Sequence, residues 1–503
     1  MTAPTPVTPV DLTPEGVTDR LGGLVVDVPA ALTDRIARTG AAVSTDDAVR
    51  SDAARDWWPI AIDWAAAGAV PRRPALVVRP VSAAQVAAVL AACNDASVPV
   101  TAMAGRSGVC GGSVPVHGGV SLDLTGLEGL VDVDETSLTA DVRAGTFGPD
   151  FEDALGKTSG GYTLGHWPQS MDLSTVGGWL ACRGAGQYST RYGKIEDMVV
   201  GLEVVLADGR VVRTEGHGPR AATGPNLTQL FVGSEGTLGI ITEARLRIHP
   251  RPAVQDRRAY GFATFADGLE ACRRILRRGA TPAVLRLYDR TESERNFDLP
   301  DTNVLIVLDE GDPDVVAATL AVVDQECATP LGVSPLDVAL VERWLGHRND
   351  VSALAPLWRA GIVVDTAEVS GPWAALPALF DDVVSALKGI DGTLAASAHQ
   401  SHAYTDGACL YFTFGGRGPE GDASWRERYY RQAWDTITAA TLRRGAAISH
   451  HHGIGLQRAR FLPHALGPAF DVLATLKQAL DPAGILNPGK LGLPSPFGPV
   501  PWP

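Results

Sequence analysis

The chain has 503 residues, of which 45% are hydrophobic and 20% charged, and this composition predicts a soluble globular protein with two or more domains. A net charge of -14 and a sequence pI near 5.3 argue against a nucleic-acid partner and provide no polybasic membrane anchor. The six cysteines are scattered without a C-x-x-C pair, so we expect reduced thiols in the cytoplasm rather than disulfides or a zinc ribbon. The N-terminus has no basic region followed by an apolar run, so we expect no targeting peptide, and we expect no membrane span.

The first part of the chain predicts a helical segment followed by a β-α-β unit. Residues 1–18 are rich in Pro and Thr and are expected to be disordered, whereas 19–70 shows helical spacing. A unit that we assign to 71–251 opens with a strand at 76–78, a capped helix and a strand at 98–101. This order predicts parallel strands, with the next loop at the carboxyl edge of their sheet.

Three glycine-rich segments interrupt this unit. The loop at 102–112 can present consecutive N–H groups to a pyrophosphate. The stretch 165–198 contains Thr175-Val-Gly-Gly, where a hydroxyl can cap a helix and bare backbone can approach a ligand, before an irregular loop that leads to a strand at Val199. The third segment spans 233–240. We interpret the three segments as walls of one ligand site.

The second half of the chain has a different order of predicted strands and helices. Residues 252–445 alternate strands and helices in a pattern that predicts an α+β domain with one antiparallel sheet covered by helices on one face. Such a domain is suited to cap a ligand held by the first. Residues 446–503 begin with a histidine-rich loop and are rich in turns, and we expect them to return to the first domain.

Three consecutive histidines form the most distinctive chemical pattern. His450, His451 and His452 lie between a helix end and two glycines, and imidazoles suit proton transfer near neutral pH. In an extended segment at most two of them, such as His450 and His452, would share one face. A metal patch or a surface run are the alternatives. A complete metal site would need further ligands, for which His399 and His402 are candidates, and we expect no metal.

Two further residues lie inside apolar strands. Tyr411 alternates with apolar neighbours, so it is a core tyrosine unless its strand faces the ligand. Arg286 places a charge in the apolar run 284–288, where an unpaired cation would be costly. We therefore expect an anionic substrate or a carboxylate to meet Arg286.

These motifs together resemble flavoproteins of the vanillyl-alcohol-oxidase superfamily, which carry an FAD-binding PCMH-type domain. Within that superfamily the chain is most similar to the alkyldihydroxyacetonephosphate synthases and their bacterial FAD-linked oxidase relatives. The resemblance covers about residues 70–490 and rests on the segments GHWPQSMDLSTVGGW, YGKIEDMVVGLEVVLADG, LFVGSEGTLGIITEA, LRLYD, GACLYFTF, SHHHGIG and LDPAGILNPGK. It implies an α+β fold, with a two-subdomain FAD-binding domain and an α+β cap.

The resemblance also implies bound FAD and assigns residues to it. The first glycine loop lacks the histidine that covalent relatives carry, which implies a non-covalent flavin. The implied FAD contacts are Ala104, Gly105, Arg106, Ser107, Gly108, Gly111, Asp172, Ser174, Thr175, Gly178, Ser234, Glu235, Gly236, Gly239 and Ile240. The implied catalytic residues are His166, Tyr411, His450, His451 and His452. Arg286 and Thr366 match substrate-binding positions.

The synthases exchange an acyl group for a fatty alcohol without net oxidation, and this chain departs from them at one position. Their second phosphate arginine is replaced by Leu354, although Arg348 or Arg359 could substitute, so we include Arg348 among the substrate contacts. A 2-hydroxy-acid dehydrogenase of the D-lactate or glycolate type is the alternative, and a non-catalytic binding subunit is a third. We expect a small anionic or lipid-like substrate, and we leave peripheral membrane contact and a homodimer open.

Overall fold

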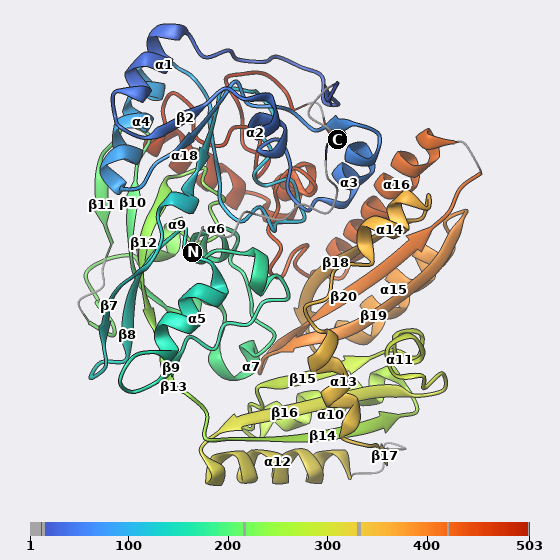
Figure 1. The fold of residues 1–503 in the computed structure, drawn as a ribbon. Helices are drawn as coiled ribbons and strands as arrows, with labels where there is room; N and C mark the ends of the chain where they lie inside the picture. The colour runs from blue at the N-terminus through green and yellow to red at the C-terminus, as the bar shows by residue number, and fades with distance from the viewer. Residues whose placement is uncertain are drawn as a thin grey trace.

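The computed structural model describes residues 12, 16–214, 218–328, 333–419, 422–500 and 502. In this part of the chain two domains pack against each other, and the C-terminal segment runs back from the second to the first (Figure 1). Most of the terminus expected to be disordered lies outside the described residues. None of the helices in the described ranges has the length and apolar character needed to cross a bilayer.

The first domain contains a four-stranded sheet in the order β2-β4-β6-β5. β4 and β5 both pair in parallel with β6, so the parallel arrangement of the β-α-β unit is confirmed, with β6 lying between the two strands that the sequence predicted. The hydroxyl of Ser82 caps the connecting helix by accepting from Gln85 N. The bounds are β2 (Ala42–Ser44), β4 (Leu76–Arg79), α4 (Ala83–Asp95), β5 (Val100–Met103) and β6 (Val120–Asp123).

The segment 19–70 differs from the helical expectation because short strands separate its helices. β2 pairs antiparallel with β4 and so extends the first sheet. A strand of three residues is too short to show a period of two, and it is the tertiary pairing that fixes it. The elements are β1 (Thr18–Asp19), α1 (Ala30–Ala37), α2 (Asp47–Asp52), α3 (Pro59–Ala66) and β3 (Ala69–Val70).

A five-stranded antiparallel sheet, ordered β11-β10-β12-β8-β7, completes the first domain. β10 and β11 form the hairpin that Asp208-Gly209 predicts. The residues before β10 differ from the expected loop, since they form the one-turn helices α7 (Ser189–Tyr192) and α8 (Ile195–Met198). The remaining elements are η1 (Leu124–Gly126), β7 (Leu130–Asp134), β8 (Thr139–Arg143), α5 (Gly148–Gly156), β9 (Tyr162–Thr163), η2 (Met171–Leu173), α6 (Val176–Cys182), β10 (Val199–Val205), β11 (Val211–Arg213), α9 (Thr228–Phe231), β12 (Ile240–Arg247) and β13 (His249–Pro250).

The second domain is built on a seven-stranded antiparallel sheet, ordered β17-β14-β16-β15-β19-β20-β18, which confirms the α+β prediction. Its strands are β14 (Val254–Phe262), β15 (Val284–Tyr288), β16 (Asn303–Gly311), β17 (Ser334–Pro335), β18 (Val363–Pro372), β19 (Thr393–Ala403) and β20 (Gly407–Gly416). Its helices are α10 (Phe265–Arg277), α11 (Arg290–Phe297), α12 (Pro313–Cys327), α13 (Ala339–His347), α14 (Leu354–Arg359), α15 (Leu376–Lys388) and α16 (Ala423–Arg443).

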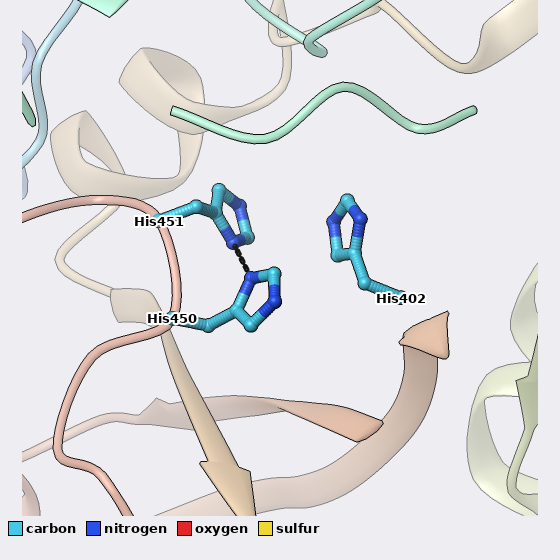
Figure 2. Close-up of side chains that lie close together, drawn as sticks. All are labelled: His402, His450 and His451. Atoms are coloured by element: carbon cyan, nitrogen blue, oxygen red, sulfur yellow. Dashed lines mark hydrogen bonds between the residues drawn. The ribbon is translucent and has the colours of Figure 1, made fainter. Parts of the chain in front are cut away.

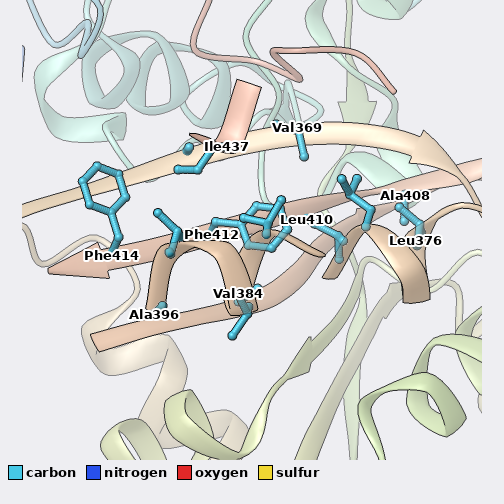
Figure 3. Close-up of a cluster of buried hydrophobic side chains, with 14 of the residues drawn as sticks. Val369, Leu376, Val384, Ala396, Ala408, Leu410, Phe412, Phe414 and Ile437 are labelled. Atoms are coloured by element: carbon cyan, nitrogen blue, oxygen red, sulfur yellow. The ribbon is translucent and has the colours of Figure 1, made fainter. Parts of the chain in front are cut away.

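The two faces of this sheet differ in polarity. On β20, Leu410, Phe412 and Phe414 are buried with side chains of α15 and α16 (Figure 3). Helices α10, α12, α15 and α16 share this apolar core. By the alternation of a strand, Tyr411 and Thr413 face the other way, toward the first domain. The expectation of helices on one face is wrong for α13, which packs on the opposite face of β15 and β16.

The C-terminal segment joins the two domains. A bridge pairs Leu486 with Val100 of the first sheet. The Asn487 side-chain amide donates to the carbonyl oxygens of Gly112 and Glu235 at 3.1 and 2.7 Å, and so ties two glycine loops together. The segment also includes η3 (Ala459–Phe461), α17 (Leu462–Leu466) and α18 (Ala469–Leu480).

Candidate functional site

A cavity of about 910 Å³ lies between the polar face of the cap sheet and the first domain. All three glycine-rich segments line it, as do residues of α11, α13, β18, β19, β20 and the loop 449–455, which we call the histidine loop. The volume is at the upper end of the range of roughly 300–1,000 Å³ for small-molecule sites. The three segments therefore do form walls of one site.

The glycine walls fit an elongated cofactor. Cβ atoms built on Gly108 and Gly112 would meet no atom closer than 3.7 Å, so bare backbone faces open cavity there. A Cβ on Gly105 would collide with the carbonyl oxygen of Leu173, so this glycine allows the first two walls to touch. Gly236 adopts φ +70° at the third wall. Such exposed N–H groups suit the phosphates of a dinucleotide.

Most of the predicted cofactor contacts line the cavity, but two do not. Gly111 packs against Trp58 and Leu456, and Asp172 is exposed outside the cavity wall. The prediction that Gly111 and Asp172 lie at the cofactor wall is therefore corrected, because their loops turn these two residues away from the cavity. The residues at the wall are Ala104, Gly105, Arg106, Ser107, Gly108, Ser174, Thr175, Gly178, Ser234, Glu235, Gly236, Gly239 and Ile240.

Two charged residues at this wall have partners within the protein. The Arg106 guanidinium donates to the carboxylate of Asp52 at 2.5 Å, so its charge is paired within the protein. Glu235 accepts from Ile454 N at 2.6 Å and Gly455 N at 2.9 Å, and its carboxylate thereby holds the end of the histidine loop. Burial raises the pKa of Glu235. Both residues line the wall, and their charged groups are bonded to other parts of the protein.

His166 does not lie at the cavity wall, contrary to the sequence interpretation. Its ring is fully buried against Trp179, with centroids 4.7 Å apart, and neither ring nitrogen has a hydrogen-bond partner. Burial lowers its pKa to about 3. The side chain is a neutral core residue behind the second glycine wall.

Tyr411 lies at the centre of a row of side chains across the cap sheet. The strand register places Glu368 on one side of it and His399 on the other. The His399 ring stacks on Tyr411 with centroids 4.9 Å apart, and His452 Nε2 lies 3.1 Å from the Tyr411 hydroxyl. The strand therefore faces the cavity, which is where the sequence analysis required a functional tyrosine to lie. Burial raises the pKa of Tyr411, so the hydroxyl stays protonated at neutral pH.

Arg286 is held by a neutral histidine. Its Nη2 donates to His399 Nε2 at 2.6 Å, and His399 Nδ1 donates to Glu292 at 2.7 Å. Burial, assisted by Arg286, lowers the pKa of His399 to about 4. Because imidazole separates Glu292 from Arg286, the guanidinium charge is not cancelled by direct contact with that carboxylate. The arrangement leaves a cation at the cavity wall for an anionic ligand.

Arg348 lies in an aromatic cage on the same side of the cavity. Its guanidinium lies 5.8 Å from the ring centroid of Trp167 and 5.2 Å from that of Tyr188. The Trp344 ring is a shared neighbour of the two arginines, since the guanidinium of each lies 5.8 Å from its centroid. Thr366 and Leu354 also line the cavity, whereas Arg359 is not among its lining residues. Arg348 is therefore the better-placed second cation.

The histidine loop is bent around one buried carboxylate. Oε1 of Glu368 accepts from the backbone N–H groups of His450, His451 and His452 at 3.2, 3.1 and 2.8 Å. It also accepts from Ser449, and Arg458 pairs with the carboxylate from behind. The segment is not extended, because three N–H groups that point at one oxygen cannot belong to an extended strand, and the two of these histidines that line the cavity are His451 and His452 rather than His450 and His452.

Glu368 also fixes the proton on His452. Its Oε2 lies 3.2 Å from His452 Nδ1, an ion-pair distance without good hydrogen-bond geometry. The carboxylate favours the proton on Nδ1, so Nε2 accepts from the Tyr411 hydroxyl. Burial alone would raise the pKa of Glu368, but Arg458 and His452 hold it well below its usual range. The carboxylate is ionised and fully buried.

Three imidazoles lie together (Figure 2), and one of them, His451, lies beside Tyr411 with ring centroids 5.9 Å apart. One ring nitrogen from each of His402, His450 and His451 falls within 4.8 Å of the others, a spacing that a metal ion could use. However, the Nδ1 atoms of His450 and His451 are hydrogen-bonded to each other at 2.8 Å. Burial lowers the pKa of all three. His402 and His451 line the cavity, whereas His450 lies behind them.

Several residues of the site escaped the sequence analysis. Glu368 and Glu292 look like ordinary charges in their segments, and Tyr404 follows a strand without any motif. Their importance depends on burial: Glu368 and Glu292 are 0% and 1% exposed. The sequence could have indicated Glu368 by its place at an inward-facing position of a strand, because a buried carboxylate requires partners.

Comparisons with known proteins are consistent with this geometry. Residues 74–215 match the FAD binding domain family, and 251–491 match the C-terminal domain of FAD linked oxidases. An uncharacterized FAD-linked oxidoreductase of Escherichia coli O157:H7 is 32% identical, over 83% of this chain and 89% of its own. Alkyldihydroxyacetonephosphate synthase of Dictyostelium discoideum is 30% identical, over 84% and 74%. Glycolate oxidase subunit GlcD of Bacillus subtilis is 28% identical, over 83% and 89%.

A solved structure of an alkyldihydroxyacetonephosphate synthase superposes with a TM-score of 0.76. The match covers 95% of this chain and 90% of the other, at 27% sequence identity. The whole arrangement of two domains and returning C-terminal segment is thus shared.

We predict that Glu368→Gln destabilises the protein by about 3–5 kcal/mol, because it leaves Arg458 as a buried, unpaired cation. Urea unfolding of the holoprotein measures the change. The double variant Glu368→Gln, Arg458→Met should recover most of the loss, whereas Asp435→Asn, at an exposed ion pair, should cost less than about 1 kcal/mol. If Glu368→Gln is as stable as wild type, the negative charge of Glu368 is not required for stability.

We also predict a pH-dependent stability difference between wild type and His166→Gln. Below pH 6.5 the unfolded chain protonates His166, whereas the native state, with a pKa of about 3, does not. Wild type should therefore lose about 2 kcal/mol relative to the variant between pH 7.5 and pH 5. Unfolding free energies of both proteins at the two pH values test this. If the difference between wild type and His166→Gln does not change with pH, the native ring takes up a proton as readily as the unfolded one, and the neutral buried ring is refuted.

Proposed function

We propose, because the chain belongs to the FAD-linked oxidase family of PCMH-type flavoproteins, that it is a FAD-dependent enzyme acting on a small anionic substrate. The observation that carries this proposal is the position of Arg286, Tyr411 and His452 on one wall of the cavity, opposite the glycine-rich walls. We further propose that the FAD is non-covalent, since residues 102–112 contain no histidine.

The residues of the cap would bind the substrate and move its protons. Bound FAD would supply an electrophilic, redox-active ring system. Arg286 and Arg348, which both contact the Trp344 ring, would hold the anionic group of the substrate. The Tyr411 hydroxyl, hydrogen-bonded to His452, is placed to exchange a proton with the reacting atom. The neutral rings of His402 and His451 can accept protons at the same wall.

The more specific proposal is an alkyldihydroxyacetonephosphate-synthase-like exchange of an acyl for an alkyl group on a dihydroxyacetone-phosphate-like substrate. Its support is the similarity to the Dictyostelium synthase over most of the chain, together with two arginines suited to a phosphate. An FAD-linked 2-hydroxy-acid dehydrogenase is the second candidate. The similarity to the Bacillus glycolate oxidase subunit supports it, and so does the cluster of His402 with the histidine loop.

Spectra of the purified protein test both candidates. We expect a yellow protein that releases FAD on acid denaturation. Alkyl-for-acyl exchange on acyl-dihydroxyacetone phosphate, without consumption of an electron acceptor, would support the synthase. Flavin bleaching by D-lactate or D-2-hydroxyglutarate, with turnover through a dye, would support the dehydrogenase. A protein that binds no FAD would refute the whole proposal.

Substitutions at the cap wall should separate chemistry from binding. Tyr411→Phe and His451→Ala should lower kcat by about 100-fold or more, with FAD content unchanged, because each removes a proton-transfer group. Arg286→Gln should instead raise KM most strongly, because it removes the cation that binds the substrate. Steady-state kinetics on the substrate found above measure both effects. Wild-type kcat in Tyr411→Phe and His451→Ala would remove these residues from the mechanism.

A further inference from the structure

A chain of hydrogen bonds leads from the cavity to a partly exposed tyrosine. Tyr404 follows β19 directly, and its hydroxyl lies 2.9 Å from His450 Nε2. His450 Nδ1 lies 2.8 Å from His451 Nδ1 (Figure 2), and the His451 ring lines the cavity. Tyr404 and His450 are absent from the cavity lining, so the catalytic wall itself does not explain their contacts.

The directions of these two hydrogen bonds are coupled. A neutral imidazole carries one proton, on one of its two nitrogens. If His450 donates from Nδ1 to His451, its Nε2 must accept from Tyr404. If His451 donates from Nδ1, then His450 carries its proton on Nε2 and donates to the Tyr404 oxygen. The chain therefore has two proton arrangements, and reversing one bond reverses the other.

We propose that Tyr404, His450 and His451 form a proton relay between the cavity and the partly exposed Tyr404, which lies where the cap meets Ser189 and Lys194 of the first domain. The proposal rests on the proposed function, which requires a substrate proton to leave or enter the cavity. Tyr404 and His450 act through His451, which is the member at the cavity. This relay gives His450 a role although it lies behind the wall.

One transfer proceeds without a change in net charge along the chain. A substrate proton joins Nε2 of His451, and the Nδ1 proton of His451 passes to Nδ1 of His450. The Nε2 proton of His450 then passes to the Tyr404 oxygen, and the Tyr404 hydroxyl proton passes to water. The chain is left with His450 donating from Nδ1 to His451 and with Tyr404 donating to His450 Nε2, and the opposite transfer restores the arrangement in which His451 donates.

The surroundings keep the histidines neutral, as the relay requires. The Lys194 ammonium lies 4.5 Å from the ring centroid of Tyr404 and pairs with Asp197 at 2.6 Å. Burial and Lys194 lower the pKa of His450 to about 4, against the attraction of Glu368. The Ser189 hydroxyl lies 3.5 Å from that of Tyr404 and 2.8 Å from His402 Nδ1. A proton thus passes through the rings without remaining on either of them.

Tyr404→Phe tests the relay because it removes only the hydroxyl. In protein labelled with 15N-histidine, ring-nitrogen shifts report which nitrogen carries the proton. We expect the shifts of both His450 and His451 to change, although His451 does not contact Tyr404 through a hydrogen bond. Spectra of apoprotein and holoprotein make this readout independent of FAD binding. Unchanged His451 shifts would overturn the coupling.

A second readout follows proton uptake when the holoprotein is reduced with an electrochemically generated viologen radical, which donates electrons without releasing protons, in weak buffer containing a pH indicator. Tyr404→Phe should bleach at the wild-type rate but take up protons about 10-fold more slowly. Added imidazole should restore the uptake. Tyr260→Phe, which loses a hydroxyl bonded to Asp324 at the far edge of the cap, is the matched control and should behave as wild type. Wild-type uptake in Tyr404→Phe would refute the relay, whereas failure to bind FAD would refute only the proposed function.

Discussion

The candidate site depends on the buried carboxylate of Glu368. An ionised side chain with no exposure is stable only when its charge and its lone pairs are matched. Arg458 supplies the charge, and three consecutive backbone N–H groups occupy one oxygen. To make these contacts the histidine loop must bend, and the bend turns three imidazoles toward the cap sheet. The position of the histidines is thus a consequence of satisfying one buried anion.

The same wall keeps most of its histidines uncharged. Burial lowers the pKa of His399, His402, His450 and His451, since a cationic imidazole loses its hydration there. Arg286, held by neutral His399, then remains as a fixed positive charge at the cavity. This division suits an enzyme that binds an anion with arginine and moves protons with imidazole and phenol.

Local patterns predicted most of the elements and the three glycine walls, but not the partners of several side chains at the site. Arg106 and Glu235 are at the cavity, yet their charges meet Asp52 and the histidine loop. His166 is in the core because its segment turns it behind Trp179. A motif specifies that a residue is near a site, whereas the direction of its side chain depends on packing from distant segments.

The sequence by itself determined the class of fold, the walls made of glycine and the residue types available for chemistry. These are set by local propensity and by the period of apolar positions, which short segments carry in full. Only the tertiary structure decided which groups meet. Glu368, Tyr411 and His399 come from three strands and share a row because of register. Arg348 and Arg286 both contact Trp344 because α13 packs on the inner face of the sheet. Such contacts join residues far apart in the chain, and no local pattern encodes them.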